Sequence, residues 1–190
     1  MIDYIIQIDR DLFHWINQEL HMSFLDPIML FLTTISNLAI IWFVVAVILF
    51  VKRKRIGGAL SSFTLFIGII LALIIDEVIN AVVGRPRPPE VEEGVRQLVD
   101  LPLSSSFPSG HAVTSFAAMF ILVYFFPKTK YWLPLLAIVF AYSRLYVGVH
   151  YPTDSIVGAL VGMMVGFLTI KLPLASLLTK LQKRYPNLNL

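Results

Sequence analysis

Two long stretches without a charged residue place the strongest constraint on the fold of this chain. Residues 27–51 and residues 56–75 contain no Asp, Glu, Lys or Arg. A bilayer has a hydrocarbon core about 30 Å thick, and a helix needs about 20 mostly apolar residues to cross it. Hydrophobic residues form 57% of the 190 residues and charged residues only 14%, compared with about 45–50% and about 25% in soluble domains. The sequence therefore predicts a polytopic membrane protein and excludes an intrinsically disordered chain.

Five transmembrane helices are predicted in all. The second span continues beyond its uncharged stretch to about residue 83, and three shorter apolar segments follow it at residues 111–126, 131–149 and 152–170. We therefore predict an all-α fold, in which residues 1–190 form a single domain and residues 27–172 form its helical bundle. Glycines at positions 158, 162 and 166 predict a small-residue packing face on the last transmembrane helix.

The two ends of the chain are more polar than the predicted bundle. Residues 1–26 carry apolar side chains at helical spacing, with charged residues between them, which predicts an amphipathic helix in the membrane interface. Acidic residues interrupt its apolar run and no basic segment precedes it, so it is not interpreted as a signal peptide. Residues 173–190 are basic and contain two prolines, which favours a surface tail with at most one or two turns of amphipathic helix.

The distribution of basic residues predicts the orientation in the membrane. The segments after the first, third and fifth spans hold ten of the fifteen Lys and Arg residues and none of the twelve acidic ones. The ten are Lys52, Arg53, Lys54, Arg55, Lys128, Lys130, Lys171, Lys180, Lys183 and Arg184. Because cytoplasmic loops carry the excess of positive charge, these segments are expected inside the cell. The basic residues are thus topology signals, and no nucleic-acid partner is expected.

The opposite side of the membrane receives the chemically unusual residues, which lie in segments 84–110 and 144–154. Arg144 falls about 13 residues into the fourth predicted span, where a charge costs roughly 2.5–3.5 kcal/mol on insertion scales. It therefore needs an anionic partner or a wet cavity. Guanidinium groups bind phosphate with paired N–H donors, and Arg85 and Arg87 lie in the same region. The alternative interpretation is that Arg85 and Arg87 contact lipid headgroups, and Arg85 fits this alternative better than Arg87.

Two histidines and the start of the third span complete the pattern. Ser109 and Gly110 precede the span, and helix N-termini bind phosphate through backbone N–H groups. His150 and Asp154 are four residues apart, and an Asp bonded to one ring nitrogen leaves the other nitrogen free to attack. His111 is suited to proton transfer. Together these groups predict phosphoryl transfer through a phosphohistidine, with a structural His–Asp pair as the alternative.

Three motifs in this region resemble those of the type 2 phosphatidic acid phosphatase family. Pro108-Ser109-Gly110-His111 matches one family motif, Ser143-Arg144-x5-His150-x3-Asp154 matches a second, and Arg87-Pro88 matches the end of another. The order and spacing of all three agree, and the resemblance covers about residues 24–172. The family fold is a helical bundle, usually described with six membrane helices; here we expect five and the interfacial helix.

The resemblance implies a role for each matched residue. His150 is the implied nucleophile, Asp154 orients it, and His111 is the implied general acid. The implied phosphate-binding residues are Arg87, Arg144, Ser109 and Gly110. Asn80 departs from the family, which usually has Lys seven residues before Arg87; either Arg85 replaces this cation, or Asn80 donates a neutral hydrogen bond. The resemblance implies no metal ion and no cofactor, and the chain contains no cysteine to supply a thiolate.

The function implied by the resemblance is hydrolysis of a lipid phosphate or diphosphate at the outer face of the cell membrane. Undecaprenyl diphosphate is the first expected substrate, with lipid A 1-phosphate, phosphatidylglycerophosphate and phosphatidic acid as rivals. Besides the lipid substrate, only membrane lipids are expected as partners. A membrane scaffold or transporter that has kept the fold is a hypothesis of another class. A vanadate-dependent oxidase is a third, although the related haloperoxidases are soluble and five spans argue against it.

Overall fold

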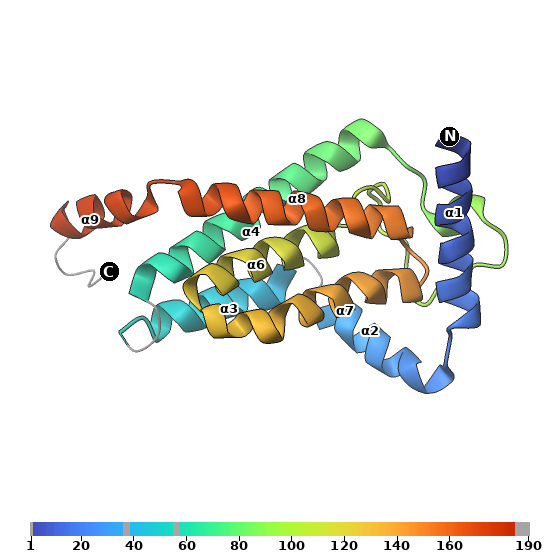
Figure 1. Cartoon of the computed structure of the whole chain (residues 1–190), viewed down its shortest axis with the longest axis horizontal. Coiled ribbons are helices and arrows are strands. Elements are labelled where there is room, and N and C mark those ends of the chain that lie inside the picture. The colour runs from blue at the N-terminus through green and yellow to red at the C-terminus, as the bar shows by residue number, and fades with distance from the viewer. Residues whose placement is uncertain (1, 36–38, 55–57, 185–190) are drawn as a thin grey trace.

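The fold is a long bundle of helices with one further helix across its end (Figure 1). The computed structural model describes residues 2–35, 39–54 and 58–184, and every regular element in these ranges is helical. The helices are α1 (Ile2–His14), α2 (Asp26–Ile35), α3 (Ile40–Val51), α4 (Gly58–Val83), α5 (Pro88–Val91), α6 (Gly110–Phe125), α7 (Leu133–Tyr146), α8 (Pro152–Lys171) and α9 (Leu174–Arg184). The predicted all-α fold is therefore confirmed.

Two of these helices are long and apolar enough to cross a membrane. They are α4 and α8, with 26 and 20 residues. The helices α3, α6 and α7 are apolar but have only 12, 16 and 14 residues. At 1.5 Å per residue, α3 is about 18 Å long, which is shorter than the hydrocarbon core of a typical bilayer. Helix length alone therefore supports two spans.

The first predicted span is divided in the structure, so the prediction of one continuous helix over residues 27–51 was wrong. The segment forms α2 and α3, and α3 begins directly after Ala39, which has a left-handed backbone with φ of 57°. A non-glycine residue in this conformation cannot continue a right-handed helix. Residues 36–38 lie outside the described residues. The whole segment is uncharged, which predicted one span, but the polar residues Thr33, Thr34, Ser36 and Asn37 fall at the break and were the available signal.

The tightest packing in the bundle joins α8 to α6 through the three glycines of α8. A Cβ atom on Gly162 would lie 2.3 Å from the carbonyl oxygen of Val113, and one on Gly158 would lie 2.8 Å from that of Ser109. A Cβ atom on Gly166 would likewise lie too close to Phe120 and to the carbonyl oxygen of Ala117. The predicted small-residue face is therefore confirmed, and its partner is α6 of the same chain. This close approach brings the first turn of α6 beside the first turn of α8.

The remaining core joins α3, α4, α6 and α7. Leu65, Ile69 and Ile121 are fully buried, and the rings of Trp42 and Phe140 meet edge to face with centroids 6.0 Å apart. These side chains come from four different helices and form one hydrophobic cluster. The cluster fixes the bundle at the end opposite α1.

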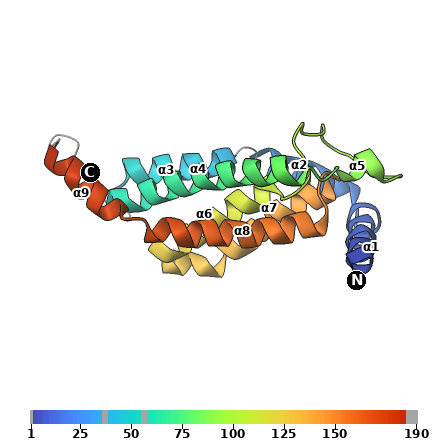
Figure 2. The ribbon, with the colours of Figure 1, turned by 90° about the horizontal axis from the view of Figure 1, so that it is seen from above.

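Helix α1 is present as predicted and lies across the end of the bundle, as Figure 2 shows from a second direction. Phe13 and Ile16 are buried under it, whereas Ile5 and Ile8 are about half exposed. Asp9 also faces the protein and is only 3% exposed. The buried face of the helix is thus mixed, because it includes one carboxylate. Apolar side chains on another face are exposed.

The basic segments gather at the end of the bundle opposite α1. The α3–α4 connection, the α6–α7 connection and α9 all lie there in Figure 1, although Arg55 and residues 185–190 are outside the described residues. The predicted tail contains more helix than expected, since α9 has 11 residues. The long segment between α4 and α6 folds over the other end, near α1.

Replacing Gly162 by Ala tests the α6–α8 contact. The added methyl group cannot fit 2.3 Å from a backbone oxygen, so the helices must separate, and we expect a loss of about 1–3 kcal/mol in stability. Thermal unfolding in detergent measures this loss. Leu160→Ala is the matched control, because Leu160 is 58% exposed on the same helix. Equal unfolding temperatures for the two variants would contradict the packing described here.

Candidate active site

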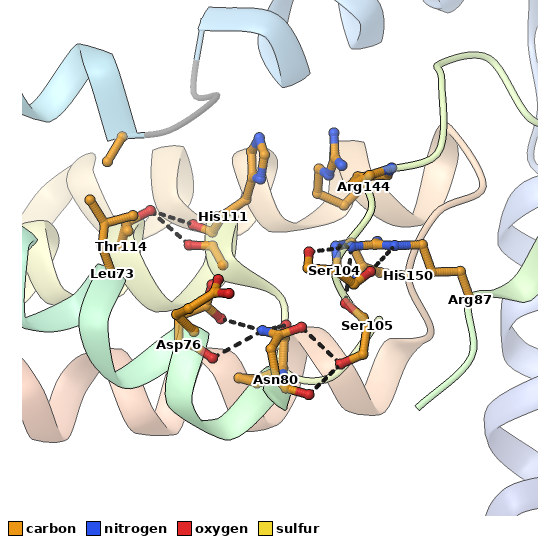
Figure 3. A pocket seen from close by; sticks show the side chains of 15 residues that line it. Leu73, Asp76, Asn80, Arg87, Ser104, Ser105, His111, Thr114, Arg144 and His150 are labelled. Carbon is orange, nitrogen blue, oxygen red and sulfur yellow. Dashed lines mark hydrogen bonds between the residues drawn. The ribbon is translucent and has the colours of Figure 1, made fainter. Parts of the chain in front are cut away.

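A cavity of about 260 Å³ lies where α4, α6 and α7 meet the loop between α4 and α6. Figure 3 shows this cavity from close by. Its charged and polar lining residues are Asp76, Glu77, Asn80, Arg87, Ser104, Ser105, His111, Thr114, Arg144 and His150. Six of the nine residues singled out in the sequence therefore line one cavity: Asn80, Arg87, Gly110, His111, Arg144 and His150. Ser109, Asp154 and Arg85 are not among its lining residues.

The short connection between α7 and α8 places His150 at the cavity. Gly148 makes the turn with φ of 85°, and a Cβ atom there would lie 2.6 Å from the carbonyl oxygen of Arg96. Pro152 then starts α8, where its missing N–H is not needed. The Asp154 carboxylate accepts the N–H of Tyr151 at 2.8 Å and caps the helix. The turn at Gly148 and the start of α8 thus fix the backbone on both sides of His150.

The hydrogen bonds of His150 assign the proton to Nδ1. This nitrogen lies 2.7 Å from the carbonyl oxygen of Ser106, which can only accept a hydrogen bond. Nε2 lies 3.2 Å from Nη1 of Arg87, which can only donate. Nε2 therefore carries the lone pair, beside the cavity.

Asp154 is the second partner of His150 Nδ1, after the Ser106 carbonyl. Its Oδ2 atom lies 3.5 Å from this nitrogen, farther than the Ser106 carbonyl. Asp154 is fully buried, and its two carboxylate oxygens accept hydrogen bonds from Arg85 and from the Tyr151 N–H. The carboxylate therefore lies beside the Nδ1 side of the imidazole.

The surroundings keep the imidazole of His150 uncharged. Burial is the largest cause and lowers the pKa of His150 to about 4; the positive charges of Arg144 and Arg87 act in the same direction, and Asp154 opposes them. At neutral pH the ring is thus neutral, with an available lone pair on Nε2.

Arg87 is held in place by the backbone of two loops. Its guanidinium donates to the carbonyl oxygens of Ser104, Ser105 and Val149 at 3.0, 3.0 and 2.9 Å. The side chain is buried, with 3% of the residue exposed. Neutral carbonyls orient the charge without neutralising it, so Arg87 remains able to bind an anion.

Arg144 is buried in α7, and the described residues offer it no ion pair. Its Nη1 atom donates to Thr33 Oγ1, and its Nε atom has no hydrogen-bond partner among the described residues. The hydroxyl of Ser109, also buried, lacks a partner in that part of the chain too. Buried charges and polar groups are normally paired. Arg144, which lines the cavity, therefore fits an anion such as phosphate.

His111 lies in the first turn of α6 and contacts α2. Its Nε2 atom is 3.1 Å from the carbonyl oxygen of Thr33, the residue whose hydroxyl receives the hydrogen bond of Arg144. Thr33 thus contacts both groups, and the sequence gave no signal of this because α2 was predicted as part of a longer span.

Three residues predicted to bind phosphate are engaged elsewhere. The Ser109 N–H donates to the Asp154 carbonyl at 3.0 Å, so it does not point at the cavity. The amide nitrogen of Asn80 donates to Asp76, at 3.0 Å to the carbonyl and 3.1 Å to Oδ1. Arg85 pairs with Asp9 and Asp154. Arg85 therefore lies in an ion-pair cluster outside the cavity, and the amide nitrogen of Asn80 is directed mainly at Asp76.

One wall of the cavity is acidic, which the sequence analysis did not predict. Asp76 and Glu77 line it, and Figure 3 shows Asp76 and Asn80 on the side away from Arg144. The spacing of Asp76 and Asn80, four residues apart on one helix, was the available signal. Among the described residues, no group of three His, Asp or Glu side chains is placed to hold a metal ion.

The bundle and its cavity define the class of this protein. Two imidazoles and two buried guanidiniums beside one cavity, at the end of a membrane-type helical bundle, form a site for phosphoryl chemistry. The class is that of membrane lipid phosphatases.

Comparison with known proteins gives the family. Residues 61–177 match the PAP2 superfamily, and the chain belongs to it. It is 31% identical over 180 residues to an undecaprenyl-diphosphatase of Sulfolobus acidocaldarius, covering 94% of this chain and 84% of that protein. It is 30% identical over 182 residues to a lipid A 4'-phosphatase of Bacteroides thetaiotaomicron, covering 88% and 78%. The crystal structure of Aquifex aeolicus LpxE superposes with a TM-score of 0.74 at 28% identity, covering 86% of this chain and 95% of that one.

The pH dependence of the reaction follows from the uncharged state of His150. Protonation of Nε2 removes the lone pair, so kcat/KM falls as the pH drops through the pKa of the free enzyme. That pKa is lowered to about 4, so we expect the acid limb of kcat/KM to lie near pH 4. Phosphate release measured between pH 3.5 and 8, corrected for the ionisation of the substrate, checks this. An acid limb centred near pH 6.5 would contradict it.

Proposed function

We propose that this protein hydrolyses a phosphate or diphosphate group on a membrane lipid, with His150 as the nucleophile. The observation that carries the proposal is the buried, neutral imidazole whose Nε2 faces Arg87 at 3.2 Å, in a cavity also lined by Arg144 and His111. A structural His–Asp pair would not need two buried guanidiniums beside the free ring nitrogen.

The proposed reaction has two steps. In the first, the lone pair on His150 Nε2 attacks phosphorus, the P–N bond forms and the bond from phosphorus to the leaving oxygen breaks. His111 supplies a proton to that oxygen. In the second, water attacks phosphorus as His111 accepts its proton, the P–N bond breaks and phosphate is released. Arg87 and Arg144 stabilise the charge on the phosphoryl oxygens in both transition states.

Undecaprenyl diphosphate is the first proposed substrate. The similarity to the undecaprenyl-diphosphatase of Sulfolobus acidocaldarius supports it. The similarity to the lipid A 4'-phosphatase keeps lipid A phosphates as rivals, together with phosphatidylglycerophosphate and phosphatidic acid.

We further propose that the bundle crosses the cell membrane five times, with α1 in the outer interface and α9 inside the cell. The basic segments at one end (Figure 1) and the cavity near the other end support this orientation. The α2–α3 segment, with its break, together makes one crossing. The site then faces the cell exterior or periplasm, at the level of lipid phosphates.

Phosphate release from a panel of lipids tests the proposed function. The purified protein should release phosphate from undecaprenyl diphosphate faster than from lipid A 1-phosphate, phosphatidylglycerophosphate or phosphatidic acid. Turnover should persist in EDTA, and vanadate should inhibit it as a mimic of pentacoordinate phosphorus. Faster release from another lipid would contradict the proposed substrate but would leave the proposed mechanism intact.

The matched control pair for this assay is His150→Ala and His21→Ala. His21 is outside the cavity, so its variant should retain activity, whereas His150→Ala should lose phosphate release by at least about a thousandfold while remaining folded. Retained turnover in a folded His150→Ala protein would refute the nucleophile. No release from any lipid by the wild-type protein would favour a scaffold or transporter.

A further inference from the structure

A buried network of charges connects α1 to the candidate active site. Asp9 of α1 accepts hydrogen bonds from the N–H and the hydroxyl of Thr153, at 2.8 and 2.6 Å. It also accepts one from Arg85 Nη2 at 2.7 Å. A carboxylate with this many donors and almost no solvent exposure is fixed in position. No motif in the sequence singled out Asp9.

Arg85 bridges Asp9 to Asp154. Its Nη1 atom donates to Asp154 Oδ1 at 2.6 Å, and its guanidinium lies over the ring of Tyr151, 4.0 Å from the centroid. One guanidinium thus serves two carboxylates, and Asp154 is fully buried. The three groups carry a net charge of −1, which lies on the far side of His150 from the cavity.

Two routes lead from Arg85 to the imidazole of His150. Through the side chain, Arg85 holds Asp154, whose Oδ2 atom is 3.5 Å from His150 Nδ1. Through the main chain, the carbonyl of Arg85 accepts the N–H of Ser106 at 2.8 Å. The Ser106 carbonyl in turn is the 2.7 Å partner of His150 Nδ1. Both neighbours of that ring nitrogen are therefore joined to residue 85, Asp154 through its side chain and Ser106 through its main chain.

We propose that Asp9 and Arg85 are positioning residues for the reaction, and that α1 completes the active site through them. The proposal rests on the proposed function, in which His150 is the nucleophile. When Nε2 bonds to phosphorus, the ring becomes positively charged, because Nδ1 keeps its proton. The excess negative charge of Asp9, Arg85 and Asp154 stabilises that intermediate. Asp9 lies outside residues 61–177, which match the superfamily.

The charge of His150 also responds to groups on other elements. Arg87 in the loop, Arg144 of α7 and His111 of α6 face it from the cavity side, and Asp154 of α8 faces it from the other. The first three remain unchanged in the variants below. Any shift between variants therefore reports the Asp9–Arg85 side.

The experiment compares Asp9→Asn and Arg85→Gln in the purified full chain, with phosphate release from farnesyl diphosphate and from p-nitrophenyl phosphate. Each variant should lower kcat by roughly ten- to a hundredfold, with KM changed less than about threefold, since neither residue lines the cavity. Asp9→Asn removes a negative charge and should move the acid limb of kcat/KM to lower pH. Arg85→Gln removes a positive charge and should move it to higher pH, each by about half a unit.

Asp11→Asn is the matched control, because Asp11 is exposed on the same helix. This variant should leave kcat and the acid limb of kcat/KM unchanged. Shifts in the same direction for the two test variants, or a kcat within threefold of wild type, would overturn the proposal. If Asp9→Asn does not fold, Asp9→Glu decides: it keeps the charge but displaces the carboxylate, so kcat should fall while the acid limb stays. An unchanged kcat in Asp9→Glu overturns the proposal. Turnover by His150→Ala would instead refute the proposed function.

Discussion

The structure depends on two buried guanidiniums that have no carboxylate ion pair within the described residues. Burying a charge in a protein interior is costly unless polar groups compensate it. Arg87 is compensated by backbone carbonyls of two loops, whereas Arg144 keeps one nitrogen without a partner in that part of the chain. An oriented but unneutralised positive charge is a binding site for an anion. Together with burial, which is the larger cause, this positive charge keeps the neighbouring His150 imidazole uncharged.

The packing of the bundle brings these groups together. Gly158 lets α8 approach the backbone of α6 at Ser109, and the Ser109 N–H donates to the Asp154 carbonyl at that contact. The first turns of the two helices are thereby joined, which sets His111 and His150 at one cavity. The positions of His111 and His150 at one cavity therefore depend on small residues where two apolar helices, α6 and α8, touch.

The sequence predicted the helical class, a helix within residues 1–26 and six of the residues that line the cavity. It did not predict the break before α3, because residues 27–51 were interpreted as one uncharged span although polar residues stand at positions 33, 34, 36 and 37. The contacts of Thr33 were therefore missed. The committed donors of Asn80 and the pairing of Arg85 with Asp9 were also missed. The Arg85–Asp9 pair joins segments 76 residues apart, and it depends on how the loop between α4 and α6 folds. The Asn80–Asp76 contact lies within one turn of α4, so only its spacing was visible in the sequence.

The most direct test of the central claim is to trap the phosphorylated protein during turnover. Radiolabelled diphosphate substrate is mixed with the enzyme, the reaction is stopped with alkali, and the labelled peptide is identified by mass spectrometry. The account predicts label on His150, stable in alkali and released by acid, and no label in His150→Ala. Phosphate release by direct attack of water, with inversion at a chiral phosphorus and no labelled protein at any time, would contradict it.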